Sequence, residues 1–160
     1  MSLTRLKDFL DSYSVKYVLI SHSVAYTAQG VAALAHVRGR ELAKTVIVKL
    51  DGEFAMAVVP AAVHVDLALL KRITGAKTAE LASELEFKTR FPDCETGAMP
   101  PFGNLYGMKV FVDETLSEDK EIAFNAGSHR ELMRMAWADF ERLVKPTVQQ
   151  IVNERAWSTV

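Results

Sequence analysis

Apolar residues recur along the chain with two different periods, and each period predicts a different kind of element. In residues 3–13 they lie three or four positions apart, which predicts an amphipathic helix at the start of the chain. Residues 67–73 and 137–144 keep this helical spacing. Asp66 is a candidate helix N-cap, and Gly75 is placed to end the same helix in the left-handed conformation. Two further helices are expected in residues 27–35 and 81–85.

Short runs of β-branched and apolar residues predict strands between these helices. Residues 44–50 and 54–59 flank Asp51-Gly52, a pair that favours a two-residue hairpin turn of type I′. The other strands are expected in residues 16–20, 108–112 and 121–125. Residues 131–135 fit either a strand or the start of a helix.

The absence of repeats, low-complexity tracts and linkers predicts one folded unit. We expect a single α+β domain built on a mixed sheet over residues 1–146. Residues 147–160 are expected to form a tail that packs as a last helix or frays. The 160 residues are enough to bury a full hydrophobic core.

Composition and charge exclude several classes of protein. The net charge is -1, from 19 basic and 20 acidic residues, so any contact with RNA must come from a local basic patch. The single cysteine, Cys94, excludes an internal disulfide and fits a reducing compartment. The N-terminus lacks a signal-like apolar run, and charges interrupt every apolar segment well before about 18 residues. We therefore expect a soluble, cytoplasmic protein with no membrane partner.

Several common catalytic motifs are also missing. The chain contains no Gly-x-Ser-x-Gly elbow, no Gly-x-x-x-x-Gly-Lys-Ser/Thr phosphate loop and no Gly-x-Gly-x-x-Gly dinucleotide motif. Its four histidines lack metal-ligand spacing, so no metal and no other cofactor is expected. Cys94 stands between two acidic residues, which disfavours a thiolate nucleophile.

Polar residues in apolar settings are the remaining candidates for chemistry. Lys44 begins a strand that reads as buried, and an ammonium there is either kept at a wet rim or held for a task. Residues 97–103 form a Gly/Pro loop with the composition of a rigid backbone surface. A long loop inside a compact domain is usually functional.

Three motifs give the chain a resemblance to a known family. They are Ala43-Lys44-Thr45-Val46-Ile47-Val48, the Gly-x-x-x-Pro loop Gly97-Ala98-Met99-Pro100-Pro101, and Glu121-Ile122-Ala123-Phe124-Asn125-Ala126-Gly127. In order and spacing they resemble the YbaK and prolyl-tRNA synthetase-associated editing domains over roughly the first 146 residues. The resemblance implies a mixed sheet or partly closed barrel flanked by helices. It also implies hydrolysis of wrongly aminoacylated tRNA, with an aminoacyl-tRNA synthetase as an open second partner.

The chemistry of ester hydrolysis suggests a separate role for the loop and for Lys44. An aminoacyl ester carbonyl becomes an oxyanion during hydrolysis, and backbone N–H groups of the loop are candidate donors to it. Lys44 is a candidate to pair with a phosphate or with ribose oxygens, and water is the expected nucleophile because no nucleophile and base pair is evident. The resemblance implies that the neighbouring ribose hydroxyl helps activate this water. The candidate catalytic residues are Lys44, Gly97, Ala98, Met99, Pro101 and His129.

A second group of residues is expected to bind substrate: His22, Tyr26, Thr45, Pro100, Phe102, Asn125, Gly127 and Ser128. Each has a competing structural interpretation. His129 fits a substrate donor, a residue that positions water, or a surface histidine. His22 and Tyr26 fit a pocket lining, or equally a solvated histidine and a core tyrosine.

The function hypothesis is a free-standing trans-editing deacylase for a small amino acid on tRNA, with tRNA(Pro) as the expected tRNA. Alanine, serine and threonine all fit, whereas cysteine is disfavoured because the loop Gly97–Pro101 lacks a serine before its final proline. The alternatives are a non-catalytic module that binds aminoacyl-tRNA or a synthetase, and a small-molecule esterase. Oligomeric state is not predicted.

Overall fold

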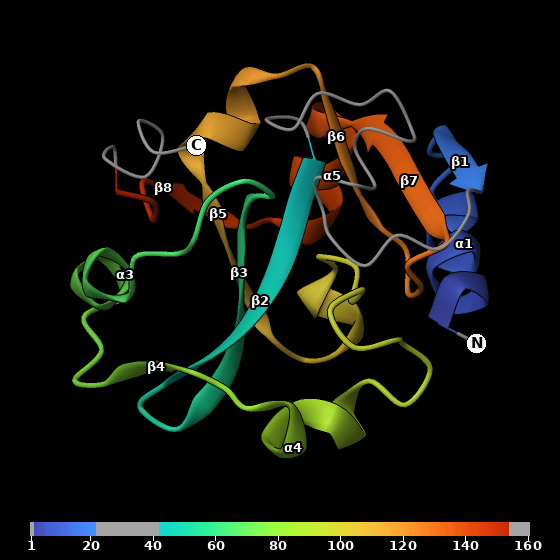
Figure 1. The fold of residues 1–160 in the computed structure, drawn as a ribbon. Helices are drawn as coiled ribbons and strands as arrows, with labels where there is room; N and C mark the ends of the chain where they lie inside the picture. The colour runs from blue at the N-terminus through green and yellow to red at the C-terminus, as the bar shows by residue number, and fades with distance from the viewer. Residues whose placement is uncertain (1, 22–41, 154–160) are drawn as a thin grey trace.

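A mixed sheet with helices on both faces organises the computed structural model, which describes residues 2–21 and 42–153 (Figure 1). The expected helix over residues 27–35 lies outside the described residues. Along the sheet the order is β1 (Tyr17–Ser21), β7 (Glu131–Ala136), β6 (Glu121–Asn125), β2 (Leu42–Leu50), β3 (Glu53–Pro60), β5 (Lys109–Asp113) and β8 (Thr147–Gln149). In addition, β4 (Ala79–Leu81) pairs with β2.

The sheet is mixed because three of its strand pairs are parallel and the others antiparallel. The parallel pairs are β2 with β6, β3 with β5, and β5 with β8. Within the described residues the order runs from β1 to β8 without closing. The single α+β domain with a mixed sheet is therefore confirmed, and the sheet is open rather than a partly closed barrel.

The β2–β3 hairpin supplies the longest pair of strands. Its turn, Asp51-Gly52, has positive φ angles of 51° and 84°, as the predicted type I′ turn requires. The hairpin holds its register from Ala43 opposite Pro60 to Leu50 opposite Glu53. Lys44 is thereby fixed near one end of a nine-residue strand.

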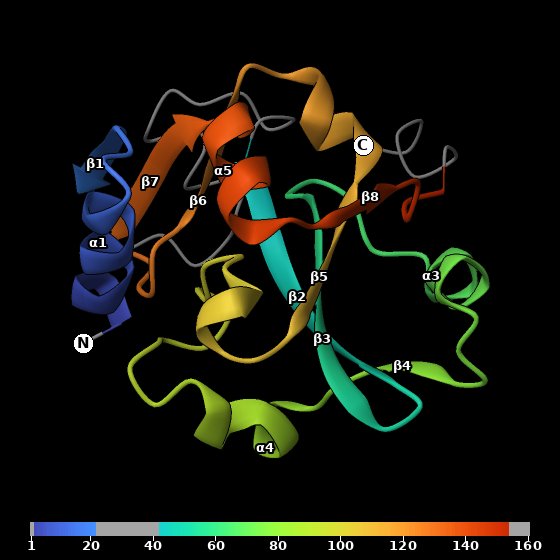
Figure 2. The same ribbon diagram turned by 180° about the vertical axis from the view of Figure 1, so that it is seen from behind.

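The predicted helices are confirmed where the structure describes them, except around residue 81. These helices are α1 (Ser2–Ser12), α3 (Leu67–Thr74) and α5 (Trp137–Val144). Asp66 caps α3 by accepting hydrogen bonds from the Ala68 and Leu69 amides, and Gly75 ends it with a φ of 73°. Figure 2 shows α5 lying across the sheet, with α1 and α3 at opposite sides of the molecule.

The helix expected over residues 81–85 is confirmed at Leu85 and wrong at Leu81. Leu81 belongs to β4 and pairs with Val48 of β2, and a separate short helix, α4 (Glu84–Phe87), begins after Ser83. Ser83 and Glu86 form a reciprocal capping box, which starts the new helix. Leu81 and Leu85 are both exposed, so their helical spacing does not mark a buried stripe.

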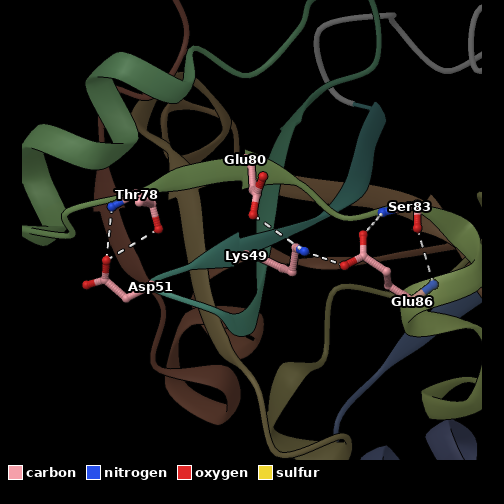
Figure 3. A network of polar contacts seen from close by, with 6 residues as sticks. All are labelled: Lys49, Asp51, Thr78, Glu80, Ser83 and Glu86. Atoms are coloured by element: carbon pink, nitrogen blue, oxygen red, sulfur yellow. Dashed lines mark hydrogen bonds and ion pairs between the residues drawn. The ribbon is translucent and has the colours of Figure 1, made fainter.

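Lys49 fastens β4 and α4 to the hairpin (Figure 3). Its ammonium lies 3.4 Å from a Glu80 carboxylate oxygen and also pairs with Glu86. The hydrogen bond from Lys49, with further bonds from Ser83, lowers the pKa of Glu86 to about 2. This pairing therefore stabilises the fold above the usual Glu pKa of 4.5 and is lost as the pH falls toward 2.

Two apolar clusters lie on the two faces of the sheet. The first joins α1 and α5 to β6 through residues such as Leu6, Phe140 and Phe124. The second lies under α3 and includes Leu70, Val59 and Ile151.

Residues 147–152 are part of the fold, and the expected terminal helix or frayed end is wrong over these residues. Strand β8 pairs in parallel with β5, and Ile151 and Val152 are buried. The carboxylate of Asp113 accepts hydrogen bonds from the amides of both residues, at 2.9 and 3.1 Å. A side chain far away in the sequence thus fixes this segment.

We expect Asp113→Ala to lower the free energy of unfolding by about 3 kcal/mol, because it leaves two buried amides without an acceptor. Asp113→Asn keeps an acceptor oxygen of the same size and is expected to lose about 1 kcal/mol. Urea unfolding at neutral pH measures both. A loss below about 1 kcal/mol for the alanine variant would show that the carboxylate does not hold the segment.

Candidate functional site

The candidate site lies where strand β6 separates from strand β2. The two strands pair only at Leu42 with Ala123 and Ala43 with Phe124. On the same edge of β2, pairing resumes at Val48 with β4. Within the described residues, positions 44–47 of β2 therefore have no strand paired with them on this edge, and the Ala82 amide donates to the Ile47 carbonyl there, at 3.0 Å.

Lys44 stands at the first position of this gap. Its side chain is half-buried, and burial is the cause of a pKa below the usual lysine value. It makes no ion pair with any residue in the described part of the chain. An ammonium in this state has lost part of its hydration without gaining a protein partner, so an incoming anion would be stabilised by it.

Asn125 is the next residue along β6 after the last pair with β2. The register therefore matches it with Lys44, and matched residues of neighbouring strands face the same side of a sheet. Asn125 is 9% exposed, and its Oδ1 has no hydrogen-bond partner among the described residues. The end of this ladder thus carries two polar side chains that the described residues leave unpaired.

The turn after β6 binds the Gly/Pro loop. Gly127 donates to the Ala98 carbonyl and accepts from the Glu95 amide, both at 2.8 Å. A ring nitrogen of His129, Nε2, lies 2.7 Å from the Thr96 carbonyl oxygen. These contacts bring the loop to the end of β6, and in Figures 1 and 2 the yellow segment lies beside β2, between the β6–β7 pair and α4.

The loop's own hydrogen bonds decide which of its amides can donate. The Ala98 amide already donates to the Glu95 carbonyl at 3.0 Å, and the prolines have no N–H. The amides of Gly97 and Met99 make no backbone hydrogen bond within the described residues. Gly97 has a φ of 82°, in the left-handed region that favours glycine. These two amides are the ones left for a ligand.

Other predicted residues lie around this centre. Thr45 is buried and, between Ala43 and Ile47, alternates to the face opposite Lys44. Phe102 is fully buried and packs against Phe124 and Phe140, so it supports the loop from the core. The Ser128 hydroxyl accepts from the Arg130 amide at 3.2 Å and shapes the turn. His22 and Tyr26 lie outside the described residues.

Sequence reasoning missed Glu95 and Thr96, which fasten the loop. Their contribution is mainly through main-chain groups, and a carbonyl or amide used as a partner leaves no mark on residue type. The Glu95 carboxylate adds an acceptor for the His129 amide at 3.3 Å. The only available signal was their position directly before the Gly/Pro loop.

A cleft of about 330 Å³ borders the loop through Thr96 and Met99. A larger cleft, of about 750 Å³, lies at the far end of the β2–β3 hairpin, next to Asp51. Among residues 2–21 and 42–153 no three His, Cys, Asp or Glu side chains gather to hold a metal ion. None of the helices described is long and apolar enough to cross a membrane.

The fold and this loop belong to a known class of protein. A family model, described as the aminoacyl-tRNA editing domain, matches residues 22–143 of the chain. The chain therefore belongs to the aminoacyl-tRNA editing domain family, and the resemblance inferred from its three motifs is confirmed.

Individual relatives agree with this assignment. The chain is 30% identical over 159 residues to the Escherichia coli K12 protein named multifunctional Ser/Thr-tRNA deacylase ProXp-y, covering 94% of this chain and 91% of that protein. The solved structure of the hypothetical protein APE2540 has a TM-score of 0.84 at 19% identity and covers 93% of this chain and 99% of its own. A proposed trans-editing enzyme for prolyl tRNA synthetase has a TM-score of 0.81 at 20% identity, with coverages of 95% and 97%. At these identities the two structures establish the fold.

Lys44 has no ion pair within residues 2–21 and 42–153, and this has a consequence for stability. Because burial lowers its pKa, the charged side chain destabilises the folded protein. This penalty is full below the folded-state pKa and vanishes as the pH rises to the unfolded value of 10.5. We expect Lys44→Met to unfold at a higher urea concentration than the wild type at pH 7, with the difference shrinking at alkaline pH.

Lys109→Met is the matched control, because Lys109 is an exposed strand lysine. It should leave the urea midpoint unchanged across the same pH range. A Lys44→Met variant that is less stable than the wild type at pH 7 would mean that Lys44 has a stabilising partner.

Proposed function

We propose that the chain is a trans-editing deacylase that hydrolyses the ester of a mischarged small amino acid on tRNA. The observation that carries this proposal is the half-buried Lys44, which has no ion pair among the described residues, at the end of the β2–β6 ladder, with the Gly97–Pro101 loop held at the same strand end. Membership of the editing family and the name of the E. coli relative support it. A solved structure of the same fold is described as a proposed trans-editing enzyme for prolyl tRNA synthetase, which motivates action in trans.

The reaction we propose is attack of water on the ester carbonyl. The amides of Gly97 and Met99 donate to the oxyanion that forms, and removal of one such donor typically costs about 10²–10³-fold in rate. The buried Pro100 and Pro101 keep the loop rigid, so these donors need no reorganisation. The oxyanion then collapses, the ribose oxygen leaves with a proton, and the products are a free amino acid and tRNA.

Lys44 holds the tRNA end in this proposal. Its ammonium pairs with a phosphate or ribose oxygen of the terminal nucleotide, which fixes the ester against the loop. Asn125, on the matched position, is a carboxamide, and residues 97–101 are Gly, Ala, Met and Pro, so none of these side chains is a nucleophile. This supports water as the attacking species.

Serine and threonine are the first candidates for the amino acid, because the E. coli relative is named a Ser/Thr-tRNA deacylase. Alanine remains a candidate, and the absence of serine from the Gly97–Pro101 loop disfavours cysteine. We propose tRNA(Pro) as the tRNA and the cytoplasm, where tRNA is charged, as the site of action. A synthetase remains a candidate second partner.

Contact with the tRNA body is proposed to come from local cations beside the loop. Lys88 and Arg90 are exposed on the segment between α4 and the loop, and Lys88 also borders the cleft of about 330 Å³. Arg90 lies over the Phe54 ring, 5.3 Å from its centre, which fixes the direction of its side chain. Phosphate contacts of this kind make affinity fall as salt rises.

The direct test is to incubate the pure protein with Ser-, Thr-, Ala- and Cys-tRNA(Pro) and with correctly charged Pro-tRNA(Pro). We expect release of the small amino acids, serine or threonine fastest, and no release of proline above background. Lys44→Ala should abolish this release without unfolding the protein. No release from any charged tRNA would contradict the proposal, and tight binding without turnover would instead indicate a non-catalytic module.

The contact of His129 with the Thr96 carbonyl predicts a positioning role. In the variant His129→Gln, the side-chain amide nitrogen can reach the same carbonyl, so this variant should stay within about threefold of the wild type in kcat/KM. His129→Ala should lose about 10²-fold, because the loop is no longer held in place.

The alternative is general acid or base catalysis by the imidazole, which typically contributes about 10²–10⁴-fold. In that case the glutamine variant would lose as much activity as the alanine variant. The wild-type pH profile would then also show a limb that both variants lack.

A further inference from the structure

Asn125 combines deep burial with an unsatisfied acceptor. It is 9% exposed and its Oδ1 has no hydrogen-bond partner in the described part of the chain. The other buried side-chain atom there without a hydrogen bond, Nε of Arg134, lies 3.6 Å from a Glu121 carboxylate oxygen and so has a charge partner. A buried carbonyl oxygen without a donor destabilises the folded state, so the fold gains nothing from this atom.

The place of Asn125 in the sheet points to a ligand group. It follows the last β2–β6 pair and, by continuation of the register, matches Lys44 on the neighbouring strand. Both side chains face the same side of the sheet, next to the turn that holds the Gly97–Pro101 loop. A group bound by Lys44 would therefore lie within reach of the Asn125 oxygen.

The remaining question is which donor fills the Asn125 acceptor, and the answer rests on the proposed function. Next to its ester bond an aminoacyl-tRNA carries two donors, the amino acid's ammonium and the free ribose hydroxyl. Lys44 is a cation on the matched position of the neighbouring strand. It repels an ammonium placed here but has no such effect on a neutral hydroxyl.

We propose that Oδ1 of Asn125 accepts a hydrogen bond from the free hydroxyl of the terminal ribose, beside the ester. This contact fixes the sugar against the Gly97–Pro101 loop while Lys44 holds the adjacent oxygens. It also selects a ribose over a deoxyribose end, because a deoxy sugar leaves the buried oxygen unpaired.

A double-mutant cycle between protein and substrate tests this contact. We compare wild type and Asn125→Leu on Ser-tRNA with an ordinary terminal ribose and on the same tRNA with a 2′-deoxy terminal ribose. The wild type should lose at least about tenfold in kcat/KM on the deoxy substrate. Asn125→Leu should lose about tenfold on the ordinary substrate, and its further loss on the deoxy substrate should be about tenfold smaller than the loss of the wild type.

Asn125→Asp is the matched control, since it keeps an acceptor of the same size and should keep a preference for ribose. Asn125→Leu should unfold at the same or a higher temperature than the wild type, because it removes an unpaired buried oxygen. If Asn125→Leu lowers kcat/KM relative to the wild type by the same factor on both substrates, the proposal is overturned. The proposal would also be overturned if the effect of Asn125→Leu on kcat/KM changed when the amino group of the substrate was acetylated and did not change when the ribose hydroxyl was removed.

Binding of uncharged tRNA separates this inference from the deacylase proposal. The wild type should bind tRNA with a terminal ribose more tightly than 2′-deoxy tRNA, and Asn125→Leu should bind the two equally. If the wild type hydrolyses no aminoacyl-tRNA but shows this difference, the deacylase proposal fails and the Asn125 contact stands. If the wild type binds both tRNAs equally, the Asn125 contact is wrong whatever the activity.

Discussion

Gly127 exchanges two main-chain hydrogen bonds with residues 95–98, and the candidate site depends on this exchange. Both bonds measure 2.8 Å, and they join the Gly/Pro loop to the turn that follows β6. Lys44 is more than fifty residues from this loop in the sequence, so only the sheet can bring them together. The short β2–β6 ladder does this by ending at Ala43, one residue before the lysine.

The site is built from groups that the fold leaves unsatisfied. Lys44 has no charge partner in the described residues, and its pKa is lowered by burial. Asn125 keeps a buried oxygen without a donor, and two loop amides have no backbone acceptor there. The half-buried ammonium and the buried oxygen each cost stability, and the surrounding sheet and its two apolar clusters offset the cost. Such a set of unsatisfied groups on a rigid frame is preorganised for an anionic, hydroxyl-bearing ester.

Local signals predicted most of the fold, and non-local contacts account for the failures. The type I′ turn at Asp51-Gly52 and the caps of α3 depend on a few neighbouring residues, so the sequence was sufficient for them. Leu81 was assigned to a helix because its spacing from Leu85 is helical, yet pairing with Val48 makes it a strand residue. Segment 147–152 was misjudged for the same reason, since Asp113 and β5 hold it from a distance.

The candidate site was predictable to the extent that it uses side chains of unusual type or place. Lys44 stood out as a charge in an apolar strand, and the Gly97–Pro101 loop stood out by composition. The donors could not be narrowed to Gly97 and Met99 from sequence, because the engagement of the Ala98 amide is a main-chain contact. The hydrogen bonds of Glu95 and Thr96 with the turn after β6 could not be predicted from the sequence for the same reason.

A crystal structure with a non-hydrolysable seryl-adenosine amide tests the central claim most directly. The account predicts the amide carbonyl oxygen within hydrogen-bond distance of the Gly97 or Met99 amide, with the ribose between Lys44 and Asn125. An analogue bound elsewhere, for example in the cleft of about 750 Å³ beside Asp51, would contradict the account. So would an analogue bound at the loop with Lys44 turned away from it.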